Sequence, residues 1–346
     1  MKAKKYLTIK TEVIAMIEFL QDRGIKVGEI RDFLAAYPDL PFQWIKIFNF
    51  FENLEESTIN MSLIKNAHRD LDAKVTSLLL YNNKLVKVID TNKEDFEALL
   101  KYYRSTIKKI FTDYSTSELI SKTDDSLGFK LNFDKEKEAF IVKNIVNDLI
   151  RIDIEDRVDE DLQREFSNII GLKEVAFPAL SAYIFDKKNN TITLSVDLAE
   201  IVKSRLVNME INSFSINLKN SVSGLNFPPT SRNIFDKINA FYKEKEGHAN
   251  QLSLKTPDGV IYHAYANAQY PDARESQYHK SGALSVGGNV SIYRIQKGFD
   301  TKRNTHYSID LKSIAAMTTK PNPVLYEATV MANNAADFID AIGRLS

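Results

Sequence analysis

The sequence predicts an α+β fold, and three observations carry that prediction. Apolar residues in the first 60 positions recur at helical spacing, a hairpin followed by a capped helix occurs twice in the middle, and short strand-like runs fill the last third. A helical part, hairpin–helix units and a strand-rich part that follow one another along the chain indicate an α+β fold. At roughly 100–200 residues per domain, 346 residues suggest about two domains. The element pattern divides the chain into a helical bundle (1–60), a hairpin–helix domain (61–165) and a β-rich domain closed by a helix (166–346).

The N-terminal 60 residues are expected to form three short helices, in a bundle like a helix-turn-helix. We predict helices over 11–23, 27–37 and about 42–54, with a turn at 38–41 between its two prolines. The third of these is apolar on nearly every face, which is typical of a helix that is buried or forms an interface. We therefore interpret it first as a packing or oligomerisation element, and second as a DNA-reading helix.

The middle of the chain contains the first predicted hairpin. Residues 75–81 and 84–90 are apolar-rich runs joined by Asn82 and Asn83, which tolerate a positive φ. Thr91 or Asn92 is then expected to cap a helix that reaches about Asp113.

A similar unit follows about a hundred residues later. Strands are predicted at 182–185 and 191–196 around Asn189 and Asn190, and Asp197 is predicted to cap a helix through about Leu206. The repetition indicates either an internal duplication or a common supersecondary unit used twice.

The last third is predicted to be mostly strands. Pro257, Asp258 and Gly259 mark the clearest turn, between strands at 252–255 and 260–265. A closing helix from about Ala335 has an apolar stripe at helical spacing. Further strands are predicted at 283–286, 290–295, 306–311 and 325–331.

The composition excludes several classes of protein. The chain has no cysteine, which removes disulfides, Cys-ligated zinc, iron–sulfur clusters and a cysteine nucleophile. No apolar run approaches the roughly 18 residues of a membrane span. Lys10, Glu12 and Glu18 interrupt any apolar signal segment. We expect a cytoplasmic protein that does not enter a membrane.

No mechanistic motif was found. The chain has no phosphate-binding P-loop, dinucleotide fingerprint, zinc-protease motif, calcium loop or nucleophile elbow. We therefore predict no cofactor and no metal, and we assign no catalytic residue in the leading hypothesis.

A local charge asymmetry is the most informative signal for function. Residues 274–320 contain eight bases against three acids, a net charge of +5 that leaves −5 for the rest of the chain. Bases contact phosphates and aromatic rings stack on nucleobases, so we predict a non-enzymatic nucleic-acid-binding protein, with DNA favoured over RNA. The residues predicted to bind are Arg274, Lys280, Arg294, Lys297, Lys302, Arg303, Tyr293 and Phe299.

The setting and two alternatives complete the prediction. A chain without a catalytic motif often serves as one subunit of a larger machine, and we expect a bacterial mobile-element or phage-defence assembly. The N-terminal helices would hold a partner protein or a second copy of the chain.

One alternative function is that of a structural protein whose basic segment pairs with the acidic stretch 148–161 in homo-oligomers. The other is a metal-dependent nuclease or hydrolase, because imidazole and carboxylate groups bind metals and transfer protons. Its candidate residues are His263, His279, His306, Asp272 and Glu275.

Overall fold

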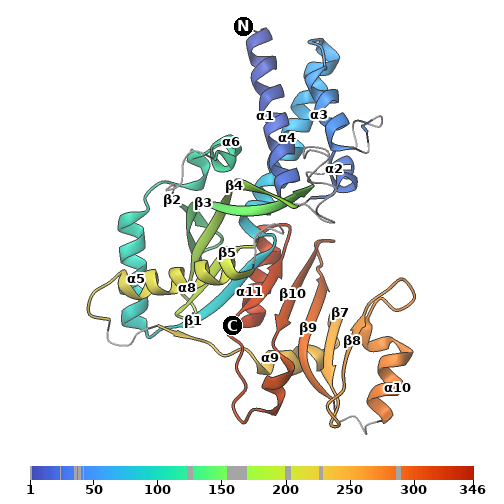
Figure 1. Ribbon diagram of the computed structural model, residues 1–346. Helices are drawn as coiled ribbons and strands as arrows, with labels where there is room; N and C mark the ends of the chain where they lie inside the picture. The colour runs from blue at the N-terminus through green and yellow to red at the C-terminus, as the bar shows by residue number, and fades with distance from the viewer. Residues whose placement is uncertain are drawn as a thin grey trace.

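The protein is a mixed α+β structure built on one large antiparallel sheet, as predicted (Figure 1). A computed structural model describes residues 2–23, 25–34, 37, 40–41, 43–122, 128–153, 170–198, 204–225, 229–285 and 290–346. Helices dominate the N-terminal part, and the strand-rich C-terminal part ends in a helix.

Within the described residues, eleven strands share the sheet, in the order β2-β3-β4-β5-β1-β11-β10-β9-β7-β8, with β6 also pairing with β1. All neighbouring strands run antiparallel. The longest pairing joins β3 and β4, and it crosses the predicted boundary between residues 165 and 166. The sheet is continuous from the middle of the chain into the C-terminal part, because β1 pairs with β11. The strands are β1 (Lys84–Asp90), β2 (Gly128–Asn132), β3 (Lys137–Asp153), β4 (Ile170–Asp186), β5 (Thr191–Asp197), β6 (Thr230–Ser231), β7 (His248–Lys255), β8 (Ile261–Tyr265), β9 (Ser291–Asp300), β10 (His306–Lys312) and β11 (Ala328–Met331).

The N-terminal bundle consists of α1 (Lys2–Asp22), α2 (Val27–Phe33), α3 (Trp44–Glu52) and α4 (Thr58–Tyr81). Helices α1, α3 and α4 project together from one side of the sheet (Figure 1). The predicted strand at 75–81 is wrong, because these residues form the last two turns of α4. Buried Ile64, Leu71, Val75 and Leu79 keep helical spacing up to that end, so the run of leucines belongs to a helix packed on α1 and the sheet.

The predicted helix after β1 is confirmed, in a shorter form. Helix α5 (Lys93–Thr106) begins at Asn92, whose side chain accepts a hydrogen bond from the Asp95 backbone N–H at 2.8 Å. The turn before β1 contains Asn83 with φ 52°, in the region where asparagine is favoured. The short η1 (Phe111–Asp113) and α6 (Thr116–Ile120) follow α5.

The second predicted hairpin is confirmed as β4 and β5, but Asp197 is not a helix cap. It is the last residue of β5, and its buried carboxylate is bound by the Arg23 guanidinium at 2.7 and 2.8 Å. The Lys84 ammonium lies 3.4 Å from the same carboxylate, and the Leu180 N–H donates to it at 3.3 Å. This ion cluster joins α1 to three strands. Helix α8 (Ser204–Asn220) follows β5.

The C-terminal third follows the prediction closely. The hairpin of β7 and β8 turns at Gly259 (φ 93°), and β9, β10, β11 and the closing helix α11 (Ala335–Leu345) occur where strands and a helix were expected. The predicted strand at 283–286 is wrong for its first three residues, which belong to α10 (Gln277–Ser285); Val286 lies outside the described residues. The remaining elements are α9 (Asp236–Lys243), η3 (Ala273–Glu275) and η4 (Ala315–Thr319).

The two faces of the sheet carry separate cores. One core combines the N-terminal bundle with α6, α9 and α11, and includes Val13, Leu71 and Phe338. The other lies under α5 and α8, where Phe96 and Ile211 meet the alternate residues of β1, β4 and β5. Helix α5 is therefore anchored by one apolar face, and its opposite face points to solvent.

Candidate nucleic-acid interface

The basic segment 274–320 is largely neutralised inside the fold. Five of its eight bases form ion pairs, so its +5 charge is not a free surface charge. Two of the pairs connect residues that are distant in sequence, Lys297 with Glu244 and Arg303 with Asp337. No ion pair joins Lys302, Lys312 or Lys320 to an acid within the described part of the chain. The five pairs are Arg274–Asp272, Lys280–Glu275, Arg294–Asp310, Lys297–Glu244 and Arg303–Asp337.

Three of the predicted binding residues are buried, which corrects their assignment. Lys297 is fully buried and donates to the carbonyls of Phe241 and Glu244, both at 2.9 Å. Phe299 packs in the core with its ring against Tyr307, and Tyr293 is also buried. A buried ring cannot stack on a nucleobase, and a buried ammonium cannot reach a phosphate, so we remove these three from the candidate interface.

The Arg274 side chain is also used inside the fold, where it links neighbouring segments of the backbone. Besides Asp272, its guanidinium donates to the carbonyls of Tyr242, Glu244 and Gly247, at 2.6 to 3.1 Å. These bonds connect η3 to the end of α9 and the start of β7. The exposed predicted residues are Lys280, Lys302 and Arg303, while Arg294 is half-buried against Asp310.

The three histidines of the predicted metal site do not come together. His263 on β8 and His306 on β10 are separated by β9 and β7, which is three strand spacings or about 14 Å. His279 is buried on α10, where its ring nitrogens contact the hydroxyls of Tyr242 and Tyr262 at 2.9 and 2.8 Å. Burial lowers the pKa of His279. Asp272 and Glu275 are occupied by Arg274 and Lys280, and no group of three acids or histidines suited to a metal occurs among the described residues.

Residues 154–161 of the predicted acidic docking stretch lie outside the described residues. The acids that pair with the basic segment come instead from Glu244, Asp272, Glu275, Asp310 and Asp337.

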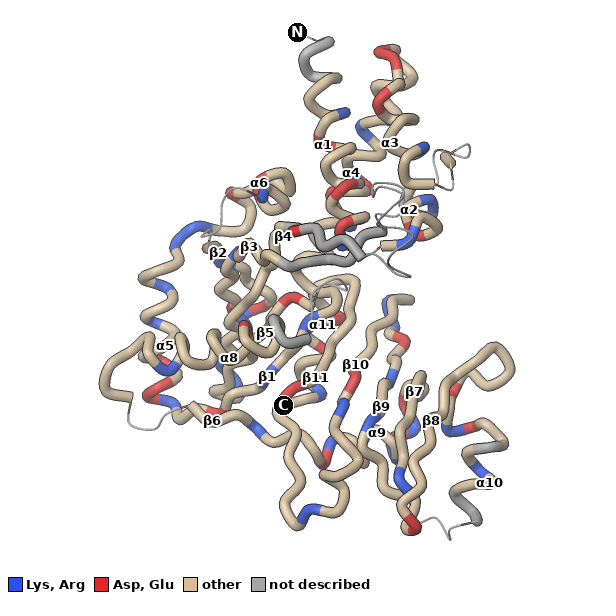
Figure 2. The backbone as a smooth tube through the Cα atoms, viewed as in Figure 1, with Lys and Arg blue, Asp and Glu red and all other residues tan. Residues whose placement is uncertain are grey.

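A different surface holds bases in excess. We define the α5 surface as six bases on and beside the second half of α5: Lys101, Arg104, Lys108, Lys109, Lys130 and Lys187. Figure 2 shows basic residues along α5 and in the segment after it. Glu97, Glu118 and Glu138 are among the carboxylates that act on these bases. Asp113 and Glu136 are also exposed close to them in the sequence.

Glu138 organises the strand side of the α5 surface. Its carboxylate is 2% exposed and contacts three bases: Arg104 at 2.7 Å, Lys130 at 2.6 Å and Lys187 at 3.6 Å. These bases hold the pKa of Glu138 at about 2, although burial alone would raise it. The Glu138 carboxylate therefore holds three basic side chains at the edge of the sheet, and each of the three remains partly exposed to solvent.

A groove of about 630 Å³ crosses the α5 surface. It lies where α5 ends, next to the edge strand β2, and the Lys130 N–H donates to the Lys109 carbonyl at 2.7 Å. The Lys109 ammonium lies 5.2 Å from the centre of the Tyr114 ring. The residues that line this groove include Ser105, Thr106, Lys108, Lys109 and Tyr114. The ammonium groups of Lys108 and Lys109 suit an anionic group such as a phosphate. The hydroxyls of Ser105 and Thr106 donate instead to the Tyr102 carbonyl.

The sequence contained a signal for this surface that the charge count over 274–320 missed. Lys101, Lys108 and Lys109 lie within nine residues that also hold Tyr102 and Arg104. Acidic residues close by in the sequence lower the net charge of this window, so the window does not stand out as basic. Lys130 and Lys187 join the cluster only through strand pairing.

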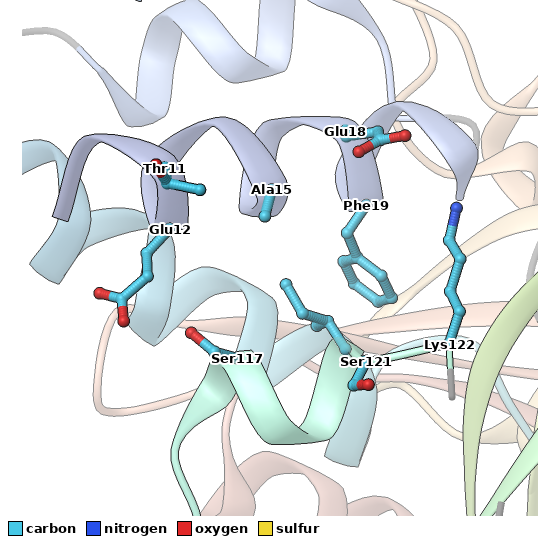
Figure 3. Close-up of a pocket in the computed structure, with 9 residues that line it drawn as sticks. Thr11, Glu12, Ala15, Glu18, Phe19, Ser117, Ser121 and Lys122 are labelled. Atoms are coloured by element: carbon cyan, nitrogen blue, oxygen red, sulfur yellow. The ribbon is translucent and has the colours of Figure 1, made fainter. Parts of the chain in front are cut away.

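A second groove, between α1 and α6, has the opposite character (Figure 3). Its apolar floor contains Ala15, Phe19 and Ile120, and Glu12 and Glu18 stand on its rim, where Lys122 is paired with Asp22 at 2.8 Å. An adjoining pocket places His68 2.9 Å from Glu12, a pair that the sequence analysis missed. This groove is unsuited to a polyanion because its carboxylates would repel phosphates.

No family model and no curated protein sequence matches the chain, and none of the described helices has the length and apolar character needed to span a membrane.

Proposed function

We propose that the protein binds nucleic acid, DNA in preference to RNA, through the α5 surface and without chemistry of its own. The observation that carries the proposal is a group of four exposed bases on and just after α5, two of which, Lys108 and Lys109, line a groove. The four are Lys101, Arg104, Lys108 and Lys109. Lysines that contact phosphates release counterions, so binding should weaken steeply as salt increases. This proposal keeps the function predicted from sequence and moves the main contacts from the segment 274–320 to α5.

The test compares two variants that lose the same charge. The first variant removes three exposed lysines from the α5 surface by changing Lys101, Lys108 and Lys109 to Ala. The second removes three exposed lysines from the C-terminal segment by changing Lys302, Lys312 and Lys320 to Ala. At about 1 kcal/mol for each lost charge-assisted contact, the first variant should bind labelled DNA about 100-fold more weakly, with a shallower salt dependence. The second should bind within a few-fold of wild type. Fluorescence anisotropy at 50 and 200 mM salt measures both.

Equal weakening by the two variants would mean that binding depends on net charge alone. Weakening by the second variant only would return the interface to the segment 274–320. No binding by wild type at either salt concentration would overturn the proposed function. A combined change of Arg294, Lys297, Lys302 and Arg303 is a poor test, because it breaks three ion pairs in which at least one partner is buried or half-buried and would destabilise the fold.

A second candidate function is protein association through the N-terminal bundle, as expected for a subunit of a larger assembly. It is favoured by three exposed apolar side chains on that bundle: Leu7 on α1 (62% exposed), Ile45 on α3 (65%) and Ile59 on α4 (73%). One face of α3 packs into the bundle, where Ile47 and Phe51 are fully buried. Only the outer side chains are therefore available to a partner.

If these side chains join two copies, light scattering should give a mass of twice 39.4 kDa at both low and high salt. Changing Leu7, Ile45 and Ile59 to Ser should then return the mass to that of one chain. A dimer that dissociates at high salt would point instead to pairing of charged surfaces, and a dimer unaffected by the three changes would place the contact elsewhere.

A further inference from the structure

The α5 surface combines the phosphate-binding groove with an exposed aromatic ring. Tyr102 lies on the exposed side of α5 and is 38% exposed. Its ring meets the buried Tyr103 edge-on, with centroids 5.3 Å apart and an angle of 88°, so one edge of the ring is supported by the core. The hydroxyls of Ser105 and Thr106, which line the groove, donate to the Tyr102 carbonyl at 2.7 and 3.0 Å. The ring and the groove are therefore built on the same last turns of α5.

The spacing of the side chains places the charges beside the ring. Residues three or four apart share a face of a helix, so Lys101 and Ser105 lie on one stripe and Tyr102 and Thr106 on the adjacent one. Lys108 and Lys109 follow directly after the helix and close the groove. Lys101 and Tyr102 thus lie one helical turn before Ser105 and Thr106, which line the groove. A chain of nucleotides with a phosphate at Lys108 or Lys109 would therefore have an exposed aromatic ring close by, on the last turns of α5.

The exposed ring favours single strands over double strands. Besides the lysines, the groove is lined by Ile107, Gly128 and Val142. A duplex presents its phosphates on a stiff convex surface whose bases are already stacked, so it has no free base to place on Tyr102. A flexible single strand can insert a phosphate and leave the next base free to stack on a protein ring.

We propose that the α5 groove is specific for single-stranded nucleic acid, taking one phosphate between Lys108 and Lys109 while an adjacent base stacks on Tyr102. This inference rests on the proposed function and names the form of its ligand. It also separates the roles of the residues: the lysines supply salt-dependent attraction for any strand, and Tyr102 supplies the preference for unpaired bases.

The test measures binding of Tyr102→Ala, Tyr102→Phe and Lys108→Ala to a 20-nucleotide oligo-dT and to a 20-base-pair duplex. Wild type should bind oligo-dT more tightly than the duplex. Tyr102→Ala should weaken oligo-dT binding about tenfold, leave duplex binding unchanged and keep the salt slope. Tyr102→Phe should restore wild-type affinity because it keeps the ring. Lys108→Ala should reduce the single-strand salt slope by about 0.7.

The outcomes separate the inference from the proposed function. If wild type binds the duplex as tightly as oligo-dT, or if Tyr102→Ala weakens both ligands equally, the single-strand inference is wrong and the nucleic-acid function stands. If neither ligand binds at low salt, both fail. Circular dichroism of each variant shows whether a lost affinity reflects lost folding, and Tyr102→Phe provides a second check because it leaves the packing on Tyr103 in place.

Discussion

Changing Asp197 to Asn should destabilise the protein by about 3–5 kcal/mol, the largest effect expected from one isosteric substitution in this chain. The carboxylate is fully buried and balances two buried cations, the guanidinium of Arg23 and the ammonium of Lys84. An amide of the same size leaves both cations without a counter-charge in a region that water does not reach. Because Arg23 directly follows α1 and Lys84 belongs to β1, the bundle and the sheet should loosen together. Urea unfolding followed by circular dichroism gives the free energy of unfolding.

Asp70→Asn is the matched control, since Asp70 pairs with Arg69 on the surface and its loss should change stability by less than about 0.5 kcal/mol. Similar small effects for both substitutions would show that the Asp197 cluster contributes little to the fold.

Lys84→Met offers an independent measurement. Burial lowers the pKa of Lys84 to about 8, against about 10.4 in an unfolded chain. Between these pH values the unfolded state binds more protons, so wild type should gain stability as pH rises through this window, and Lys84→Met should lose that gain.

Changing Glu138 to Gln should lower stability while strengthening nucleic-acid binding. The substitution removes the carboxylate that holds Arg104, Lys130 and Lys187 together, at an expected cost of about 2 kcal/mol at pH 7, because the three bases are themselves partly solvated. It also raises the charge of the α5 surface by one unit and frees bases for phosphates. DNA affinity at low salt should therefore rise several-fold, with a steeper salt dependence.

The pH dependence of Glu138 has a defined sign. Its pKa is about 2 in the folded protein and about 4.3 in an unfolded chain, so its stabilisation is complete above about pH 4.3 and is lost as pH falls toward 2. The stability difference between wild type and Glu138→Gln should shrink over the same interval.

Glu136→Gln changes the same charge at an exposed position two residues away and serves as the control for both readouts. If Glu138→Gln destabilises the protein without increasing DNA affinity, the α5 surface is not the interface. If Glu136→Gln strengthens binding as much as Glu138→Gln does, net charge alone explains the gain.

The sequence by itself determined the elements whose signals are local. The Asn92 cap before α5, the turn at Gly259 and the apolar stripe of α11 each depend on residues within one or two turns of chain, and the structure confirms all three. The α+β class follows from the order of such elements. The run at 75–81 was misread because a short apolar run suits a strand or a buried helix equally, and only its position on α4, against α1 and the sheet, decides between them.

Only the tertiary structure decided which charges are free. The partners of Lys297, Arg303 and Asp197 lie 53, 34 and 174 residues away, so counting charges in a sequence window could not show that these groups neutralise one another. The α5 surface arises in the same way, because strand pairing brings Lys130 and Lys187 to Glu138 and Arg104. Periodicity and capping act over a few residues of one segment. Coulomb attraction acts between whatever groups the fold brings within a few ångströms, and a long-range sheet sets those neighbours independently of their distance in the sequence.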